Sequence, residues 1–396
     1  MIPDYPLTLD VTDRRVLVVG GGPVAARRTA SLVDAGAQVH VVAPALCEDL
    51  TDLAQAGQVN WLARDYQRGD LDGAWLVHTA TGDRDVDAAV AAEADERRIW
   101  CVRADAAGAS SAWTPAVARS GDVMVAVTAG GDPTRARILR AAIALALDTG
   151  GLPVRRHRPH GGSVALVGGG PGDPGLITTR GRRLLAEADV VVVDRLAPRA
   201  LLAGLDPDVV VIDAGKTAGH HPMPQEEINR TLIEHAQAGR AVVRLKGGDP
   251  FVLGRGGEEA LACVAAGVPV EVVPGVTSAV AVPAAAGIPV THRGRARQVT
   301  IASGHEGLDW AALSALEGTL VLLMAVSALE DATAALVAAG KSPQTPVAVV
   351  ESGCSPRQRT TVGTLSTIAA LARERQVQAP AVVVIGDVVD LHDVLG

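Results

Sequence analysis

Short apolar runs alternate with helical segments along almost the whole chain, and this alternation constrains the fold more than any other feature. The apolar runs of the first half cover residues 16–19, 38–42, 75–79, 99–103 and 123–127. Segments of helical character, 24–35 and 85–98 among them, lie between these runs. Such an alternation predicts a parallel, doubly wound sheet. We therefore expect a Rossmann-like α/β fold in the first half.

The second half begins an alternation of its own, which is again typical of an α/β fold. Its apolar runs cover residues 164–167, 190–193, 209–212, 241–245, 268–273, 299–302, 319–324, 347–350 and 382–385. This series is long enough for two lobes with a cleft between them, and a chain of 396 residues suits more than one domain. The stretch 149–162 is rich in Gly, Pro and Arg and has no apolar period, which is typical of a linker. We expect domains at 1–148 and 163–396, joined by this linker.

Composition and charge exclude several classes of protein. The formal net charge of −8 argues against a nucleic-acid-binding protein, which usually has a basic excess. No run of 18 or more apolar residues is present, and the first residues have no basic region followed by an apolar stretch. The four cysteines are scattered and form no CxxC pair, so neither a disulfide framework nor a zinc site is predicted. We expect a cytoplasmic protein that binds neither nucleic acid nor a membrane.

The first apolar run leads directly into a glycine loop that predicts a dinucleotide site. The sequence Gly20-Gly21-Gly22-Pro23-Val24-Ala25 reads G-x-G-x-x-A between a strand and a helix. In this pattern the first glycine permits a tight turn, the second lets the backbone approach a pyrophosphate, and the helix N-terminus favours the anion. A merely structural turn is the alternative. The second run ends in Val41-Val42-Ala43-Pro44, without the acidic residue that holds a ribose, so NAD and NADP both stay open.

The run at 164–167 leads into a second glycine loop of a different kind. It continues as Gly168-Gly169-Gly170-Pro171-Gly172-Asp173-Pro174. Two prolines and an aspartate stand where a Rossmann helix begins, which predicts an extended turn. A dinucleotide site is therefore not expected here.

Four sequence blocks identify the family of the second half. They read VALVGGGPGDPGLITTRGRRLLAEADVVVVDRL, DAGKTAGHHPMPQEEINR, VVRLKGGDPFVLGRGGEE and VVPGVTSAVAVPAAAGIPVTHR, in this order. Residues 163–390 thereby resemble uroporphyrinogen-III C-methyltransferases, which implies a two-lobed tetrapyrrole methyltransferase fold, S-adenosylmethionine as cofactor and uroporphyrinogen III as substrate. The first half is similar to the precorrin-2 dehydrogenase/sirohydrochlorin ferrochelatase domain of siroheme synthases. The full-length resemblance is to that family, which joins the two modules in this order.

The resemblance implies a pair of proton-handling residues for methyl transfer, with Asp194 as proton acceptor and Lys216 as proton donor. Asp194 directly follows an apolar run, and open α/β sheets place their sites at the carboxyl ends of strands. From residue type alone, an ion pair between Asp194 and Arg195 and a plain surface charge at Lys216 are the alternatives.

The resemblance also implies a set of contacts to S-adenosylmethionine. These residues are Pro171, Gly247, Gly248, Asp249, Val252, Thr277, Ser278, Met324 and Gly353. Glycines let backbone groups approach the cofactor, and Asp249 could offset its positive charge. Where the family commonly has Tyr-Met-Gly, this chain has Leu323-Met324-Ala325.

The tetrapyrrole substrate carries several carboxylates, so its pocket needs cations. Cationic candidates in or beside the motifs are His220, His221, Arg244, Arg255, His292 and Arg293.

In the first half, the resemblance implies that Asp105 serves both as the base for dehydrogenation and as a transient ligand of the Fe²⁺ to be inserted. A turn or helix cap is the alternative for Asp105. The expected NAD contacts are Gly20, Gly22, Pro23, Val24, Pro44 and Ala45. The family's Asn-Val-Val-Asp here reads Val102-Arg103-Ala104-Asp105, and the family's helical dimerisation segment is shortened.

The resemblance implies a homodimeric, multifunctional enzyme of siroheme biosynthesis. It methylates uroporphyrinogen III twice to precorrin-2, oxidises precorrin-2 with NAD to sirohydrochlorin, and inserts ferrous iron. The alternative is a uroporphyrinogen-III methyltransferase of the siroheme or cobalamin branch with a non-catalytic N-terminal nucleotide-binding module.

Overall fold

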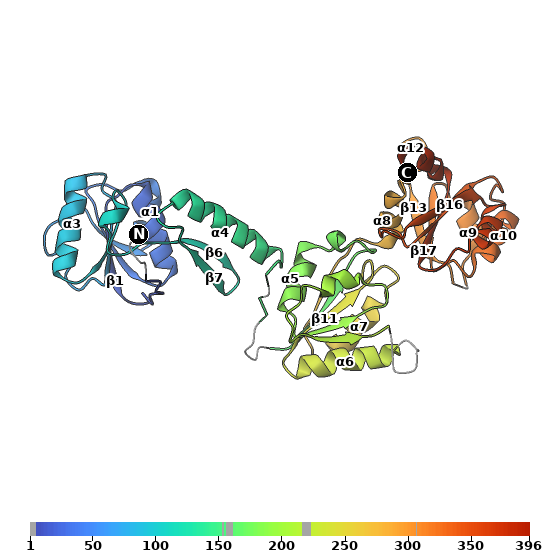
Figure 1. Cartoon of the computed structure of the whole chain (residues 1–396), viewed down its shortest axis with the longest axis horizontal. Coiled ribbons are helices and arrows are strands. Elements are labelled where there is room, and N and C mark those ends of the chain that lie inside the picture. The colour runs from blue at the N-terminus through green and yellow to red at the C-terminus, as the bar shows by residue number, and fades with distance from the viewer. Residues whose placement is uncertain (1–4, 153, 156–160, 216–222, 306) are drawn as a thin grey trace. The chain divides into compact units, whose positions relative to one another are not determined.

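The computed structural model describes residues 5–152, 154–155, 161–215, 223–305 and 307–396. The chain divides into two compact units, Met1–Ile143 and Ala144–Gly396 (Figure 1). Within the described ranges, no helix has both the length and the apolar character needed to cross a membrane.

The N-terminal unit contains a parallel sheet, as the sequence predicts, but one of its five strands, Val59–Leu62, is not among the predicted runs. Its strands are β1 (Arg15–Val19), β2 (Gln38–Val42), β3 (Val59–Leu62), β4 (Leu76–Thr79) and β5 (Trp100–Arg103). They lie in the order β3-β2-β1-β4-β5, and every neighbouring pair is parallel. The strand order reverses beside β1, so a crevice is expected at the carboxyl ends of β1 and β4.

Helices cover both faces of this sheet (Figure 1). The helices of the unit are α1 (Pro23–Asp34), α2 (Glu48–Gln55), α3 (Arg84–Glu96) and the short η1 (Ala107–Ala109). Val16 and Val18 pack with α1 and α2, whereas Leu17 and Val19 pack with α3. Since side chains alternate between the faces of a strand, a continuous apolar run buries both faces.

The apolar run at 123–127 does not close the parallel sheet, so that prediction is wrong. It forms β7 (Val123–Val127), which pairs with β6 (Ala116–Ser120) in a separate, two-stranded antiparallel hairpin. The turn contains Gly121, whose φ of 58° suits a tight two-residue hairpin turn. Partly buried and exposed residues alternate along β7 because one face of this hairpin stays open, and within β7 only Val127 is buried. Helix α4 (Pro133–Asp148) follows and spans the boundary between the two units.

The first sheet of the C-terminal unit is also entirely parallel. Its strands are β8 (Ser163–Gly168), β9 (Val190–Val193), β10 (Val210–Asp213), β11 (Ala241–Lys246) and β12 (Val270–Val273), in the order β10-β9-β11-β8-β12. One face packs against α5 (Thr179–Glu187) and η3 (Arg199–Leu202), with η2 (Pro174–Leu176) nearby in the sequence. The other face packs against α6 (Gln225–Gln237) and α7 (Gly256–Ala265).

The second sheet of this unit is mixed, and it forms the second lobe that the sequence predicts. Its strands are β13 (Val299–Ser303), β14 (Thr319–Leu323), β15 (Pro346–Glu351), β16 (Arg359–Thr364) and β17 (Ala381–Ile385). In the order β13-β14-β17-β15-β16, only β13 and β14 are parallel.

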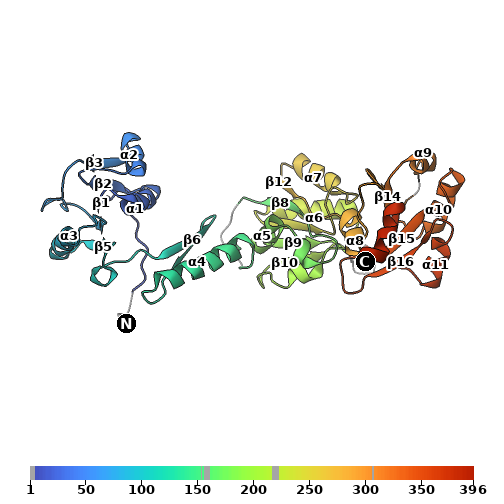
Figure 2. The same ribbon diagram turned by 90° about the horizontal axis from the view of Figure 1, so that it is seen from above.

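Helices cover both faces of the mixed sheet (Figure 2). One face packs against α8 (Ser278–Ala285) and η4 (Asp387–Leu391), after which α12 (His392–Leu395) ends the chain. The opposite face packs against α9 (Trp310–Ala315), α10 (Leu329–Ala338) and α11 (Ile368–Glu374).

Candidate functional site

The three glycines of the first loop meet different surroundings. A Cβ atom at Gly20, whose φ is 125°, would lie 2.3 Å from the Ala80 carbonyl oxygen. A Cβ at Gly21 would lie 1.8 Å from the carbonyl oxygen of Ala45, so this glycine is packed against the loop after β2. A Cβ at Gly22 would meet nothing within 4 Å. The first two glycines are therefore required by the protein's own backbone, whereas Gly22 leaves space for a ligand.

The start of α1 can accept an anion. Gly22 is the N-cap, Pro23 is the first helical residue, no side chain caps the helix, and its first turn carries no acidic residue. Backbone N–H groups at such a start form an anion site. Pro44 and Ala45 belong to the adjacent loop, which the hydrogen bond from Cys47 N to Gly21 O (2.8 Å) ties to the glycine loop. The predicted NAD contacts therefore come together at the carboxyl ends of β1 and β2.

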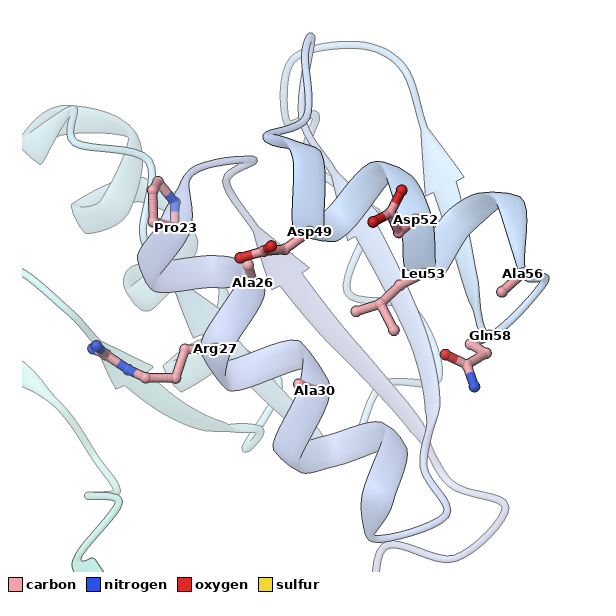
Figure 3. Close-up of a pocket in the computed structure, with 9 residues that line it drawn as sticks. All are labelled: Pro23, Ala26, Arg27, Ala30, Asp49, Asp52, Leu53, Ala56 and Gln58. Carbon is pink, nitrogen blue, oxygen red and sulfur yellow. The ribbon is translucent and has the colours of Figure 1, made fainter.

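An open hollow of about 450 Å³ lies between α1 and α2 (Figure 3). Pro23 lines it at the glycine loop, and Arg27, Asp49 and Asp52 contribute charges of both signs. The hollow lies beside the candidate pyrophosphate position and includes no residue that the sequence singles out apart from Pro23.

Asp105 lies just beyond β5, at the same end of the sheet as the glycine loop. The N–H of Ala104 donates to Thr79 O (3.0 Å), and β4 separates β5 from β1. Arg103 binds both oxygens of the Asp105 carboxylate, with Nε 3.0 Å from Oδ1 and Nη2 2.7 Å from Oδ2. These hydrogen bonds lower the pKa of Asp105. The structure thus adds Arg103 to the surroundings of the predicted base, and the signal is its position two residues before Asp105.

His78 lies in β4, the strand that pairs with β5, and its side chain is buried. Its surroundings indicate a structural role. Its side chain lies 3.3 Å from Arg28 Nη1, which also donates to Val102 O. Burial, together with the Arg28 charge, lowers the pKa of His78 to about 3. The imidazole is therefore neutral at physiological pH.

In the C-terminal unit, close backbone contacts between glycines form the centre of the candidate cofactor site. Gly170 and Gly248 pair in an isolated bridge, with Gly248 N 2.7 Å from Gly170 O. A Cβ at Gly275 would lie 2.2 Å from Gly248 O, and a Cβ at Gly168 would lie 2.5 Å from Gly275 N. The extended turn predicted after β8 passes through this bridge, and α5 begins only at Thr179. The loops after β8 and β11 and the segment before α8 therefore meet at one point.

Other predicted contact residues surround this point. Gly248 has a φ of 64°, and a Cβ there would lie 3.5 Å from Ser278 N and 3.9 Å from Thr277 Cα. Gly172, next to Pro171, lies close to Gly353, since its Cβ would be 3.0 Å from the Gly353 carbonyl oxygen. The structure thus brings together Pro171, Gly248, Thr277, Ser278 and Gly353.

The Asp249 side chain connects the loop after β11 to Gly275, in the segment between β12 and α8. Its Oδ1 accepts hydrogen bonds from the N–H groups of Phe251 (2.8 Å) and Val252 (3.2 Å), and its Oδ2 accepts one from Gly275 N (3.0 Å). Both carboxylate oxygens are engaged with backbone, so the side chain shapes the loop in addition to supplying negative charge.

Non-glycine residues with positive φ gather in the loops around this site. Leu253, Arg255, Met324, Ser352 and Cys354 all have φ between 47° and 58°. Such conformations are rare for side-chain-bearing residues and cluster at functional sites. Met324 follows β14 in the second lobe and is 44% exposed, whereas Ser352 and Cys354 flank the predicted contact Gly353.

Asp194 follows β9 and lies beside the loop that contains Gly247. Its N–H donates to Leu245 O (2.8 Å), and a Cβ at Gly247 would lie 2.8 Å from Leu196 Cβ. The partner of its carboxylate is Arg244, with Nη2 3.3 Å from Oδ1, instead of Arg195. Lys216, His220 and His221 lie outside the described residues.

Arg244 does not fit the role of a cation that binds substrate, and its inclusion among those candidates is wrong. It is 2% exposed and binds Glu259, Asp194 and Val192 O. Sequence reasoning missed Glu259 as its partner, although two basic residues at alternate positions of an apolar strand signal a buried counter-ion.

Three candidate cations remain at the surface. Arg255 binds Glu258 through two hydrogen bonds. His292 and Arg293 line an open hollow of about 460 Å³ together with Arg297. Across the described ranges, no three His, Cys, Asp or Glu side chains are grouped as a metal site requires.

Comparisons with known proteins agree with this geometry. Residues 163–369 match the family of tetrapyrrole (corrin/porphyrin) methylases, and residues 7–116 match a putative NAD(P)-binding family. Uroporphyrin-III C-methyltransferase from Thermus thermophilus, solved with S-adenosyl homocysteine, is 42% identical and covers 58% of this chain and 100% of its own, with a TM-score of 0.52. A cobalt precorrin-4 methyltransferase is 30% identical over 58% of this chain and 96% of its own, with a TM-score of 0.53.

Some relatives align with almost the whole of this chain. The siroheme synthase of Sodalis glossinidius is 39% identical over 98% of this chain and 94% of its own length, and that of Chromobacterium violaceum is 37% identical over 99% and 96%. The first alignment spans 446 positions, more than the 396 residues of this chain, so the relative has segments that are missing here. With a tetrapyrrole methylase domain after a putative NAD(P)-binding domain, the chain belongs to the siroheme synthase family.

Proposed function

We propose that the C-terminal unit methylates uroporphyrinogen III twice, using S-adenosylmethionine, and so forms precorrin-2. The observation that supports this most strongly is the packing of the Asp194 loop directly against Gly247, at the start of the glycine-lined loop. A candidate proton acceptor thus lies beside the loop that follows β11, close to the point where the glycine loops meet. Both groups lie at the carboxyl edge of a parallel sheet, where such folds bind ligands.

The residues fit S-adenosylmethionine. Gly248, Thr277, Ser278 and Gly353 offer backbone surface, and the acidic Asp249 lies in the same loop. When bound, the cofactor supplies a methyl group on a positively charged sulfur for in-line attack by a ring carbon. The protein's tasks are to align the ring and to move protons.

Asp194 takes the proton that the ring loses as the new carbon–carbon bond forms. Its side chain is 34% exposed, so it can reach a substrate while remaining fixed by Arg244. By resemblance, Lys216 is the proton donor. His292 and Arg293 are candidate partners for the carboxylates of the substrate.

We propose further that the N-terminal unit oxidises precorrin-2 with NAD and that Asp105 then helps to insert Fe²⁺, which is a substrate and not a resident metal. The open position at Gly22 and the uncapped start of α1 fit the pyrophosphate of a dinucleotide. Asp105 lies at the same edge of the sheet and is a candidate base.

One preparation of the full-length protein tests all three activities. Uroporphyrinogen III with S-adenosylmethionine should yield precorrin-2, addition of NAD should yield sirohydrochlorin, and addition of Fe²⁺ should yield siroheme, each followed by absorbance. No methylated product would contradict the methyltransferase proposal. Methylation without oxidation would instead assign a non-catalytic nucleotide-binding role to the N-terminal unit.

A further inference from the structure

A buried cluster of charged side chains lies beneath Asp194. Arg244 and Lys246 occupy alternate positions of β11, on the face that also carries Val242 and packs against α6 and α7. Glu259 of α7 meets both of them. Arg244 is 2% exposed, Lys246 5% and Glu259 0%. Two cations therefore take places where the strand would otherwise continue its apolar row, and a buried carboxylate of α7 faces them.

Glu259 is the anchor of this cluster. Its Oε1 accepts hydrogen bonds from Arg244 Nε (3.0 Å), Lys246 Nζ (3.1 Å) and Gln225 Nε2 (3.2 Å). Burial, followed by the nearby Arg244 charge, lowers the pKa of Lys246. A single carboxylate therefore holds two cations from one strand.

Arg244 connects this anchor to Asp194. While Nε binds Glu259, Nη2 lies 3.3 Å from Asp194 Oδ1 and Nη1 lies 3.3 Å from Val192 O. All three guanidinium nitrogens are engaged, so the planar group has a fixed orientation. Among the described residues, no hydrogen bond to the other Asp194 oxygen, Oδ2, is found. The cluster thus holds one oxygen of the candidate base and leaves the other available.

Lys246 connects the same anchor to the candidate cofactor loop. It directly precedes Gly247, and its carbonyl oxygen accepts a hydrogen bond from Gly169 N (2.8 Å). Side chain and backbone of this one residue therefore join Glu259 to the glycine loops.

Stability alone does not explain these charges. Removing charged groups from water is costly, and buried ion pairs often stabilise a protein no more than well-packed apolar residues do. An apolar pair at 244 and 246 would also have continued the core formed by Val242. The charged side chains fix the position of the Asp194 carboxylate and of the start of the Gly247 loop, and apolar side chains could not do this.

We propose that Arg244, held by Glu259, is a positioning residue for methyl transfer that fixes the Asp194 carboxylate relative to the Gly247–Pro250 loop. This role rests on the proposed function of Asp194 as proton acceptor. It assigns to Arg244 no contact with substrate.

A double-mutant cycle tests the role. Arg244→Met, Asp194→Asn and the double variant are assayed for kcat of uroporphyrinogen III methylation, and the Kd for S-adenosylmethionine is measured by calorimetry. We expect Arg244→Met to lower kcat by about 10- to 100-fold, the size of effect produced by misplacing a catalytic group. The Kd should change less than about twofold, since Arg244 is buried and is not among the candidate contacts of the cofactor. In the Asp194→Asn background, Arg244→Met should have no further effect, because the group that it positions is gone.

The matched control is Arg155→Met. Arg155 binds Asp189 and Asp206 at the opposite, amino end of the same sheet, so kcat should stay at the wild-type value. The thermal unfolding midpoint of each variant separates a folding defect from a catalytic one. Should Arg244→Met fail to fold, Glu259→Gln replaces it in the cycle, because it keeps the size of the side chain and removes the charge that holds Arg244.

The outcomes separate this role from the proposed function. If Arg244→Met lowers kcat by the same factor in the wild type and in Asp194→Asn, Arg244 does not act by positioning Asp194. Its role would then be structural. If Asp194→Asn is as active as the wild type, Arg244 has no base to position and the inference fails, although the methyltransferase activity stands. A wild-type protein without methylation would contradict the proposed function itself.

Discussion

Arg103 donates two hydrogen bonds to Asp105, one to each carboxylate oxygen, across only two positions of the chain. Both carboxylate oxygens of the proposed base, Asp105, are therefore already hydrogen-bonded to Arg103. A hydrogen-bonded carboxylate with a lowered pKa is a weaker base and a poorer ligand than a free one. Where the family has a valine, this chain carries a group that competes with both proposed roles of Asp105.

Replacing Arg103 by Val should therefore release Asp105. Because the pKa of Asp105 is lowered by Arg103, its return toward the ordinary value should move the acid limb of the pH–rate profile for precorrin-2 oxidation to higher pH. Iron insertion at limiting Fe²⁺ should become about two- to fivefold faster, the effect expected when a weak ion pair is removed. Arg119→Val in β6 is the control, and an unshifted acid limb in Arg103→Val would show that Asp105 is not the titrating base.

Two adjacent glycines should respond differently to substitution. A side chain at Gly22 meets open space, so Gly22→Val should leave the unfolding midpoint unchanged and raise the Kd for NAD by about tenfold or more, because it fills the pyrophosphate position. A Cβ at Gly21 meets the Ala45 carbonyl oxygen, so Gly21→Ala should destabilise the unit by about 1–3 kcal/mol. Calorimetric titration and thermal unfolding measure the two effects. Normal NAD binding by a folded Gly22→Val protein would remove the dinucleotide from this loop.

Asp249 should matter for both loop structure and cofactor binding. Asp249→Ala leaves the N–H groups of Phe251, Val252 and Gly275 without their acceptor, which should cost about 1–3 kcal/mol of stability. The Kd for S-adenosylmethionine should rise because the loop is released. Asp309→Ala is the control, since Asp309 caps α9 through Ala312 N (3.0 Å) and should leave the Kd unchanged. Tight cofactor binding by a destabilised Asp249→Ala protein would limit Asp249 to a structural role.

The stability of the N-terminal unit should fall in acid because of His78. The folded state lowers the pKa of His78 to about 3, whereas in the unfolded chain it returns to its ordinary value near 6.5. Between these values the unfolded state binds the extra proton, so each unit of falling pH should cost at most about 1.4 kcal/mol. Tryptophan fluorescence reports mainly this unit, which contains Trp61, Trp75, Trp100 and Trp113 of the five tryptophans. His78→Gln should flatten the pH dependence, and an unchanged slope would show that another group titrates.

Features that depend on neighbouring positions in the chain were predictable. The runs that became β1 and β8 are apolar at every position, which is typical of strands buried on both faces, and each leads into glycines that a tight turn needs. The same local pattern identified Gly22 as a candidate site residue, whereas the candidates Gly248 and Asp194 came from the family resemblance. The α/β class and the two lobes of the C-terminal unit followed from a longer series of this kind.

The run at 123–127 shows the limit of such patterns. A short apolar run does not specify its partner, and β7 pairs with β6 across a turn at Gly121 instead of joining the parallel sheet. Hydrogen bonding between strands depends on their positions in space, which a single run does not encode.

The sequence by itself determined the α/β class, the glycine loops and the family. Only the tertiary structure decided which charges meet. It placed Glu259 against Arg244 and Lys246, turned Arg244 away from a substrate-binding role, and set Arg103 on Asp105. Apolar periodicity is local and can be read along the chain. A charge in the core needs a partner, because an unpaired buried charge is costly. Which residue becomes that partner depends on the element that packs against the charge, and this is decided only by the tertiary structure.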